Sequence, residues 1–389
     1  MFKLKCKAQK YQWGKPGRES EVAKFVNGSV DPNEHYAELW MGTHQNGPSE
    51  LEDGTSLAEY LTRNPKALGN HEKGELQFLF KVLSVNTALS VQSHPTNEQA
   101  QILHKNDPKN YPDPRHKPEM AIALGDFELL CGFRENEDLL AHIKKYIEVV
   151  SLFDERLLSD FTHESKEKQK ETLQQIFTAI WKSPKEEITQ VVGEIVNRVK
   201  GHHQKTELDD LLIRLDNQYP GGDVGVLAPI FLNYFTLKEG ESTFLGPNEP
   251  HAYLSGNCIE CMACSDNTIR AGLTPKFKDV ETLTKSLTYK MTPPPYFHAK
   301  EAAAGVLEYA PPVPEFAVQK IVSSAKVIPH IDGSSIIVVV RGGTTLTSGD
   351  KSLSLKAGQV GFLTAELKDV TLSSTSDLLA FRAFTPLPN

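Results

Sequence analysis

Polar side chains occupy alternate positions in the segment ALSVQSHP, residues 88–95, directly before a proline. They are Ser90, Gln92 and His94. The flanking residues favour a strand, in which side chains two positions apart point to the same side. The three side chains are therefore expected to face one space, where an imidazole and an amide oxygen could bind a metal ion. A purely structural role is the alternative, because His94 could simply cap the end of the strand.

Two further candidate ligands lie far along the chain. They are Glu119, in the segment RHKPEM, and His251, in the segment PNEPHAYL. Two imidazoles and a carboxylate suit Zn²⁺, with the amide oxygen of Gln92 as a weaker fourth ligand, and such a set leaves a coordination position open for catalysis. Harder metals are also compatible, because the set contains no thiolate.

The cysteines do not form a second metal site. Their positions are Cys6, Cys131, Cys258, Cys261 and Cys264. The last three look like a metal motif, but their neighbours favour a strand, where Cys261 would point away from Cys258 and Cys264. We interpret these three as small buried residues. Five cysteines, three of them close together in the sequence, make a poor framework for disulfides. Free cysteines are typical of a protein in a reducing compartment.

The composition excludes several classes of protein. The chain has 389 residues, 39% hydrophobic and 24% charged, which is typical of a soluble globular protein with two or three domains. Its net charge of −8 argues against a nucleic-acid partner but allows a small anionic ligand held by a few local cations. No run approaches the roughly 18 apolar residues of a membrane span, and the N-terminus has no apolar core for export. We therefore expect a cytosolic protein.

Short strands are expected around the candidate ligands. The apolar runs at 75–85, 87–93 and 118–124 predict strands. The segment 36–44 is either a strand or a helix. The segment 102–118 carries four prolines and is expected to form a loop.

The character of the chain changes near residue 136. Residues 136–218 are charged and poor in glycine. The segments 172–183, 186–200 and 207–215 have the apolar spacing of amphipathic helices. We expect a helical insertion of about 80 residues.

Strand character returns after the insertion. The segment 229–240 predicts a strand, and proline-rich connectors follow at 293–295 and 310–316. The last 60 residues contain short strands at regular spacing, which is typical of a sandwich or barrel.

An internal repeat links the two β-rich parts. The segments LKEGESTFL, 237–245, and LKAGQVGFL, 355–363, share the pattern L-K-x-G-x-x-x-F-L. A duplicated β-domain would explain the repeat, although a Gly turn before a strand is common in jelly rolls. The first copy leads to His251, whereas Asp369 stands at the equivalent place in the second copy. Only the first β-domain is then expected to bind a metal through histidine.

Several motifs together resemble those of the type I phosphomannose isomerases, over essentially the whole chain. The motifs are YQWG at 11–14, AELWMGTHQNGPS at 37–49, LQFLFKVLS at 76–84, VQSHP at 91–95, HKPE at 116–119 and PNEPHAYLSGN…SDNTIRAGLTPKFKD from 247. The resemblance implies a mainly β fold with a helical insertion. Its parts are a cupin or jelly-roll catalytic β-barrel, an α-helical domain and a second, C-terminal jelly-roll-like β-domain.

The domain boundaries follow from the changes in composition. The catalytic cupin domain is expected over 1–134 and 221–300, with the helical insertion at 135–220 between its two parts. The C-terminal β-domain, 301–389, is expected to carry no metal ligands.

The resemblance also implies the reaction. Type I phosphomannose isomerases interconvert mannose 6-phosphate and fructose 6-phosphate, and the plausible route is a cis-enediol with zinc as Lewis acid. We expect one zinc ion per chain, a phosphosugar substrate, a monomeric cytoplasmic enzyme without nucleic-acid or membrane partners, and a role in mannose metabolism and GDP-mannose synthesis.

The family motifs assign roles to thirteen residues. The implied zinc ligands are Gln92, His94, Glu119 and His251. The implied catalytic residue is Arg270, and we add Lys117 and Glu260, which the motifs place in the pocket, as candidate catalytic bases. The implied substrate-binding residues are Trp13, Lys81, Ser90, Tyr253, Asp266 and Lys276. Ser90 and Lys276 match the phosphate contacts. By default the two tryptophans, Trp13 and Trp40, would be core residues.

The identity of the proton-transferring base stays open at this point. Arginine is a poor base because its pKa is about 12.5 or higher, so Arg270 is expected to stabilise negative charge. Glu260, a zinc-bound hydroxide and Lys117 are the remaining candidates.

Three competing functions are compatible with parts of the sequence. An iron oxygenase of the cupin type could use two histidines and a carboxylate, but Gln92 and the nearby cations favour a phosphosugar. A sugar-phosphate binder without catalysis would be expected to lack a ligand or Arg270, and neither is replaced. The helical insertion could also serve as an interaction module, although its charged faces are compatible with simple solvation.

Overall fold

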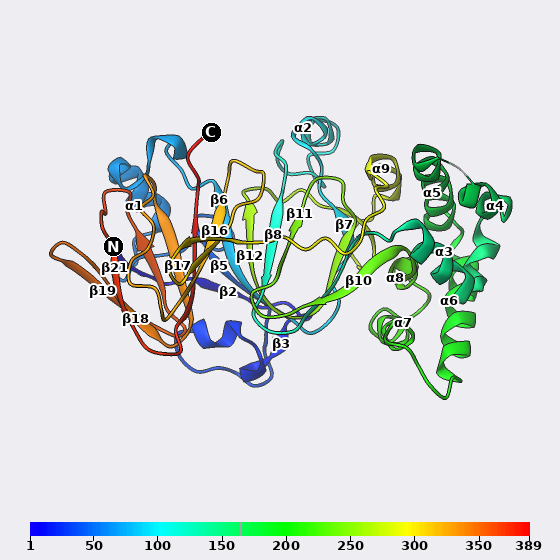
Figure 1. The fold of residues 1–389 in the computed structure, drawn as a ribbon, viewed down its shortest axis with the longest axis horizontal. Helices are drawn as coiled ribbons and strands as arrows, with labels where there is room; N and C mark the ends of the chain where they lie inside the picture. Colours follow the sequence, from blue (N-terminus) through cyan, green and yellow to red (C-terminus); the bar gives the residue numbers. More distant parts are fainter. Residues whose placement is uncertain (164) are drawn as a thin grey trace.

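The computed structural model describes residues 1–163 and 165–389 (Figure 1). The protein is mainly β, and a group of helices is inserted between two strands of the central sheet. In Figure 1 these helices lie at one end of the molecule and the C-terminal strands at the other, with the central sheet between them. No helix among the described residues is both long and apolar enough to cross a membrane.

The central sheet has ten strands. They are β2 (Lys7–Gln9), β5 (Glu38–Met41), β6 (Phe78–Val85), β7 (Val91–Ser93), β8 (Glu119–Ala123), β9 (Phe127–Phe133), β10 (Leu232–Leu237), β11 (Ser242–Leu245), β12 (His251–Ala263) and β13 (Ile269–Gly272). A small separate pair is formed by β3 (Lys15–Pro16) and β4 (His35–Tyr36). Apolar and β-branched residues dominate β6, which is buried along its whole length.

The long strand β12 joins the two halves of this sheet. Its first part pairs with β7 and β9, and its second part pairs with β6 and β8. Gly256 lies between the two parts with a φ of +110°, and a Cβ there would lie 2.3 Å from the carbonyl oxygen of Asp126. Only glycine fits this close approach at a positive φ. Strands from distant parts of the chain therefore meet around β12.

Most predicted strands near the ligands are confirmed, with some corrections. Strands β6 and β8 lie within their predicted segments, and 36–44 contains β5 rather than a helix. The predicted strand 87–93 is regular only over β7, and the predicted strand 229–240 begins with the short helix α8 (Ala228–Phe231). The predicted loop 102–118 was wrong at its start, because α2 (Asn97–Asn106) continues into it. Thr96 and Gln99 form a capping box for α2, and the first proline follows its last residue by two positions.

The helical insertion contains the three predicted amphipathic helices. Its helices are α3 (Asn136–Lys145), α4 (Arg156–His163), α5 (Lys166–Trp181), α6 (Lys185–Lys200), α7 (Glu207–Gln218) and α8. Their apolar faces pack into one buried cluster that also includes residues of β7, β12 and β13, such as Val91, Ala252 and Ile269. The insertion therefore shares a core with the central sheet.

The remaining helices are short. They are α1 (Leu57–Arg63), α9 (Val280–Ser286) and the 3₁₀ segments η1 (Gly17–Glu19), η2 (Val22–Phe25), η3 (Pro65–Ala67), η4 (Asn70–Glu72), η5 (Ile147–Leu152) and η6 (Val224–Leu227).

The C-terminal part is all β, as predicted. One sheet contains β14 (Lys300–Ala303), β15 (Val306–Tyr309), β16 (Ala317–Val322), β17 (Ser335–Arg341), β20 (Val360–Leu363) and β22 (Leu379–Phe384). A second sheet contains β18 (Gly343–Ser348), β19 (Lys351–Lys356) and β21 (Thr371–Ser374). The first strand of the chain, β1 (Phe2–Leu4), pairs with β20 and so completes the first of these sheets.

The two copies of the sequence repeat have a similar local conformation. In each copy a strand ends, a turn follows and a new strand begins, with Gly240 at a φ of +83° and Gly358 at +88°. The shared glycine is therefore explained by the turn. A duplication of the β-domain stays a prediction.

Cys258 and Cys261 lie in β12 and face opposite sides, as predicted, whereas Cys264 follows the strand and is only partly buried. Cys258 and Cys261 are buried in different apolar clusters. Among the described residues, the only group of three or more potential metal ligands contains no cysteine.

A buried carboxylate connects the central and C-terminal parts. Glu72 is fully buried and accepts hydrogen bonds from the backbone N–H groups of Gly69 and Ser334, at 2.6 and 2.8 Å, and from the Ser334 hydroxyl at 2.5 Å. Removing the carboxylate would leave these donors unpaired, which is the costly way to lose a buried hydrogen bond.

We therefore expect Glu72→Ala to lower the free energy of unfolding by about 3 kcal/mol, measured by urea denaturation. The exposed neighbour Glu75 provides the control, because Glu75→Ala should change this free energy by less than about 0.5 kcal/mol. Equal effects of the two substitutions would show that Glu72 does not stabilise the junction.

Candidate metal centre and active site

Strand pairing brings the predicted ligands together from three distant segments. Gln92 lies in β7, directly opposite His251 at the start of β12. On its other side Gln92 lies opposite Arg270 in β13. Glu119 begins β8, which pairs with the far half of β12. The sheet therefore places two ligand segments and the arginine of the NTIRAG motif side by side.

Three of the four predicted ligands form a compact, buried group. The Oε2 atom of Glu119 lies 3.0 Å from Nε2 of His94 and 3.5 Å from Nε2 of His251. The ligand atoms of these three residues all lie within 4.8 Å of one another. All three side chains are at most 3% exposed, so few waters can screen their interaction. Two imidazoles and a carboxylate in this arrangement suit Zn²⁺.

The outer hydrogen bonds fix the tautomer of both histidines. Nδ1 of His94 donates to the carbonyl oxygen of Asn267 at 2.9 Å, and Nδ1 of His251 donates to the carbonyl oxygen of Glu249 at 3.0 Å. In the neutral ring each Nε2 then carries a lone pair, which is the usual state of a metal-bound histidine. Burial lowers the pKa of His94 to about 4, which keeps this ring neutral.

Two lone pairs and a carboxylate that face one another require a cation. Burial alone would raise the pKa of Glu119, but its interactions with His94, Lys117 and His251 hold this pKa well below its ordinary value. Glu119 is therefore ionised. The donor set fits a divalent cation, which would join three groups that otherwise repel one another.

Gln92 faces the same point through its amide group. Its Nε2 atom lies 3.4 Å from Nε2 of both His94 and His251, and its Oε1 atom accepts a hydrogen bond from the Ser90 hydroxyl at 2.7 Å. The predicted shared face of these residues is confirmed. Rotating the amide by 180° would turn its oxygen towards the histidines and its nitrogen towards Ser90, and the two orientations are nearly indistinguishable by shape. Gln92 could thus supply the fourth, weaker ligand.

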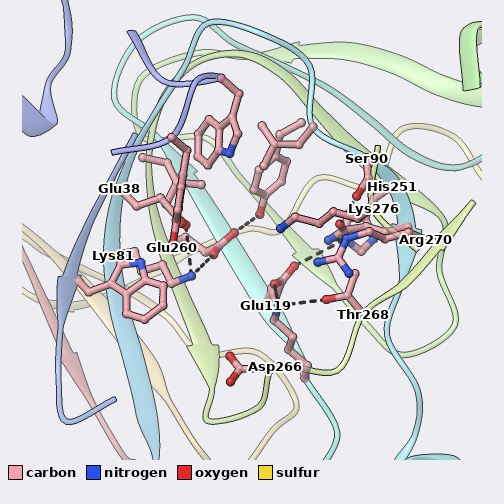
Figure 2. Close-up of a pocket in the computed structure, with 18 of the residues that line it drawn as sticks. Glu38, Lys81, Ser90, Glu119, His251, Glu260, Asp266, Thr268, Arg270 and Lys276 are labelled. Carbon is pink, nitrogen blue, oxygen red and sulfur yellow. Dashed lines mark hydrogen bonds and ion pairs between the residues drawn. The ribbon is translucent and has the colours of Figure 1, made fainter. Parts of the chain in front are cut away.

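A cavity of about 580 Å³ opens beside this group. Twelve of the thirteen predicted site residues line it, and the exception is His94, which is fully buried behind its surface. The twelve are Trp13, Lys81, Ser90, Gln92, Lys117, Glu119, His251, Tyr253, Glu260, Asp266, Arg270 and Lys276. Figure 2 shows the labelled members pointing into one space, with Glu38, Lys81 and Glu260 on one side and Ser90, Arg270 and Lys276 on the other.

A buried network of charges forms the first side. Nζ of Lys81 lies 3.2 Å from Oε1 of Glu38 and 3.9 Å from Oε1 of Glu260, and it lies over the ring of Trp40 at 4.9 Å. Burial alone would lower the pKa of Lys81, but the carboxylates of Glu38 and Glu260 raise it above its ordinary value. Lys81 is therefore a permanent cation and not a base.

The same network prepares Glu260 for proton transfer. Its Oε2 atom accepts a hydrogen bond from the Tyr253 hydroxyl at 2.6 Å. Burial, followed by the negative charge of Glu119, raises the pKa of Glu260 to about 7, although Lys81 opposes this change. A carboxyl group whose pKa lies near neutrality can both accept and release a proton under ordinary conditions.

The second side carries positive charge without a carboxylate partner. Among the side chains that the structure describes, neither Arg270 nor Lys276 forms an ion pair with an acidic residue. Partial burial, followed by the charge of Arg270, lowers the pKa of Lys276, which indicates that the two cations lie close enough to repel each other. The hydroxyl of Ser90 adds a neutral donor nearby. Two cations that repel each other in a cavity are suited to an anionic ligand.

Two further predicted residues, Lys117 and Asp266, also line the cavity. Nζ of Lys117 lies 3.5 Å from Oε1 of Glu119 and donates to the Thr268 hydroxyl at 3.3 Å. Asp266 lies at the exposed edge, where Nε2 of His44 donates to its two carboxylate oxygens at 3.1 and 3.0 Å. The hydrogen bond from His44 lowers the pKa of Asp266 below its ordinary value, although burial opposes this change.

Among the lining residues that the analysis of the sequence missed, three contact predicted site residues. Glu38 and Thr268 were not singled out, and Trp40 was assigned to the core by default, whereas all three line the cavity. A usable signal existed for Glu38, because it is a charged residue inside the apolar run AELWM, and buried charges require a partner. Thr268 lies inside a family motif but has no chemical signal of its own.

The arrangement can bind and polarise a small oxygen-rich anion. The metal ligands, a carboxyl group with a pKa near 7 and a pair of cations all face one cavity. These are the components needed to hold a phosphorylated sugar and to move a proton between two of its carbons.

Comparison with family models identifies both parts of the architecture. Residues 1–136 match the model "Phosphomannose isomerase type I, catalytic domain", and residues 152–232 match "Phosphomannose isomerase type I, helical insertion domain".

Full-length relatives extend this similarity to the whole chain. The chain is 46% identical to a probable mannose-6-phosphate isomerase of Caenorhabditis elegans, covering 100% of this chain and 96% of that protein. It is 41% identical to the mannose-6-phosphate isomerase of Homo sapiens, with 98% of each covered. A solved mannose 6-phosphate isomerase of Salmonella typhimurium, bound to its substrate and a zinc atom, superposes with a TM-score of 0.86 at 29% identity and covers 99% of both chains. The chain therefore belongs to the type I phosphomannose isomerase family.

Proposed function

We propose that this chain is a zinc-dependent aldose–ketose isomerase that interconverts mannose 6-phosphate and fructose 6-phosphate. The observation that carries the proposal is the single cavity lined by metal ligands, a carboxyl group with a raised pKa and two cations without carboxylate partners among the described residues. The two sugars differ by a proton moved between C2 and C1 and by the protons on O1 and O2. A cis-enediol between them requires one base on one face of the sugar.

We also propose the finer architecture that the family resemblance implies. The catalytic part would be a cupin-type barrel over 1–134 and 221–300, with the helical insertion at 135–220 and a jelly-roll-like C-terminal domain at 301–389. The pairing of β1 with β20 suggests one adjustment, in which residues 2–4 are counted with the C-terminal domain.

His94, Glu119, His251 and Gln92 would hold the zinc ion. When bound, zinc acts as a Lewis acid towards the sugar oxygens. The fully buried His94 and the outer hydrogen bonds of both histidines keep the ligand side chains in place.

Glu260 is our proposed base. It is buried, it lines the cavity, and the Tyr253 hydroxyl orients it. Lys117 also lines the cavity, but its Nζ atom lies beside the ligand Glu119, which suits a charged donor to a sugar oxygen better than a base. The pH dependence of kcat/KM in Glu260→Gln, described below, distinguishes Glu260 from Lys117 as the base.

Arg270, Lys276 and Ser90 are our proposed anion contacts. The fixed geometry of the Arg270 guanidinium suits the developing negative charge of an enediolate, whereas Lys276 and Ser90 are placed with the phosphate. The remaining lining residues, Trp13 and Asp266 among them, would contact the sugar.

The rival functions fit the cavity less well. An iron oxygenase would need molecular oxygen for turnover, and it gives no role to a pair of cations such as Arg270 and Lys276. A binder without catalysis gives no reason for a buried carboxyl group with a pKa near 7. The monomeric state, the cytosolic location and the link to GDP-mannose synthesis stay predictions.

Removal of the metal should abolish the isomerisation of mannose 6-phosphate, with or without oxygen, and added Zn²⁺ should restore it. The metal content, measured by atomic absorption, should fall from about one zinc ion per chain to almost none in His94→Ala. It should stay unchanged in the control His330→Ala, whose exposed side chain pairs with Asp332 far from the site. Full activity in a metal-free sample would contradict the proposal.

The pH dependence should report the charge state of Glu260. A base acts only when deprotonated, so kcat/KM should fall as the pH decreases through the pKa of Glu260, which is about 7 before the positive charge of the metal lowers it. Glu260→Gln should reduce kcat by about 10²–10⁴-fold and remove this acidic limb. Lys81→Met should move the limb to higher pH, because Lys81 lowers the pKa of Glu260. If kcat/KM of Glu260→Gln still falls as the pH decreases, the base is another group, and Lys117 is the next candidate to test.

Loss of the Lys276 ammonium should weaken binding of the phosphate. Lys276→Ala should raise KM for mannose 6-phosphate by about 10–100-fold, because a hydrogen bond to a charged group is worth about 1.5–3 kcal/mol. It should raise the inhibition constant of inorganic phosphate in parallel. Lys278→Ala is the matched control, since Lys278 is exposed two positions along and does not line the cavity. Equal KM values for the two variants would remove Lys276 from the phosphate site.

A further inference from the structure

The strands β7 and β13 form a small unit that carries much of the proposed chemistry. Gln92 in β7 lies opposite Arg270 in β13, and Ser90 directly precedes β7. Both strands are short, and their register is irregular between Arg270 and Gly272. Among the described residues, the only strand pairing that joins this unit to the rest of the sheet is that of His251 with Gln92. Such a short ladder needs further support to hold side chains in place.

The helical insertion bonds to the backbone just after Arg270, at Ala271 in β13 and at Leu273 directly beyond this strand. Nε1 of Trp181, the last residue of α5, donates to the carbonyl oxygen of Ala271 at 3.1 Å, and this bond is buried. Oδ1 of Asp223, just before η6, accepts from the N–H of Leu273 at 2.9 Å. The same oxygen accepts from the N–H of Gly225 at 2.8 Å. Asp223, which lies within residues 152–232 that match the model of the helical insertion domain, therefore connects this part directly to the chain after Arg270.

Two further features make this contact close and specific. A Cβ at Gly272 would lie 2.8 Å from Cα of Gly225, so both backbones need glycine to approach each other. Leu273 has a φ of +50°, which residues other than glycine rarely adopt. The hydrogen bond to Asp223 is the contact that fixes the N–H of Leu273 in this conformation.

The end of helix α7 bonds in the same way to the chain before β7. Oε1 of Gln218 accepts from the N–H of Ala88 at 3.0 Å, and the hydroxyl of Tyr219 donates to the carbonyl oxygen of Ala88 at 2.5 Å. The insertion thus bonds to both the N–H group and the carbonyl oxygen of Ala88, which lies two positions before Ser90. In Figure 1 the helices lie beside the end of the sheet that contains β7.

We propose that the helical insertion sets the position of the β7–β13 unit in the active site. Trp181 and Asp223 act as positioning residues for Arg270, and Gln218 and Tyr219 act as positioning residues for Ser90. None of these four lines the cavity, so they act through the backbone and not on the substrate. The inference rests on the proposed isomerase function and gives the insertion a role within it.

The first test removes one N–H group from the insertion. Trp181→Phe keeps an aromatic ring against Phe177, on which Trp181 stacks at 3.9 Å, but removes the donor to Ala271. We expect kcat for mannose 6-phosphate to fall about tenfold with a smaller change in KM, since small displacements of a positioned group have large effects on rate. The control is Tyr146→Phe, which removes a buried hydrogen bond to Asp209 in the same insertion, at 2.7 Å. It should lower the melting temperature and leave kcat unchanged.

The second test uses a conservative pair at Asp223. Asp223→Asn keeps an oxygen that can accept from Leu273 and should retain nearly wild-type kcat. Asp223→Ala removes the acceptor and should lower kcat about tenfold. In the same variants, hydrogen exchange of the Leu273 amide should be faster in Asp223→Ala than in Asp223→Asn. Gln218→Ala should similarly speed exchange at Ala88 and raise KM.

The outcomes separate the inference from the proposed function. A wild-type protein without mannose 6-phosphate turnover would overturn the function, while the exchange measurements would still test the support of the two strands. The inference is overturned if Trp181→Phe and Asp223→Ala lower the melting temperature as Tyr146→Phe does but leave kcat, KM and amide exchange at Leu273 unchanged.

Discussion

The structure depends on one electrostatic requirement: a buried carboxylate and two imidazole lone pairs face each other with few waters between them. Glu119 lies 3.0 and 3.5 Å from the Nε2 atoms of His94 and His251, and backbone carbonyls bind both Nδ1 atoms. Three electron-rich groups at this separation are unfavourable in a medium of low dielectric constant unless a cation joins them. The order of the strands, their register and the change of pairing partners along β12 bring these groups to one place.

The charged residues of the cavity form two regions, one in which charges neutralise one another and one that is positive. Around Lys81, carboxylates and a cation neutralise one another, and this balance leaves Glu260 with a pKa of about 7. Around Arg270 and Lys276, positive charge is left without a carboxylate among the described residues. A sugar phosphate is itself divided in this way, with a charged group at one end and neutral reacting carbons at the other. The cavity thus matches the polarity of the molecule.

The sequence was sufficient for local structure and for the chemistry of the ligands, and insufficient for long-range placement. The alternation of Ser90, Gln92 and His94 predicted their shared face, because a strand has a period of two. Helix α2 was missed because the prolines that follow it led to the prediction of a loop, although Thr96 and Gln99 form a capping box. Glu38 was missed because its partner, Lys81, is 43 positions away and only strand pairing reveals it. The bonds from Trp181 and Gln218 to the site likewise depend on tertiary packing that no local pattern encodes.

The pairing of β1 with β20 has a consequence for synthesis. Residues 2–4 are synthesised long before their partners, residues 360–362. The seven-stranded sheet that contains both cannot be completed until β20 has left the ribosome, and until then the strand edges that pair in the folded protein stay uncovered. Strand β1 must therefore stay without its partner during the synthesis of the whole segment that separates it from β20.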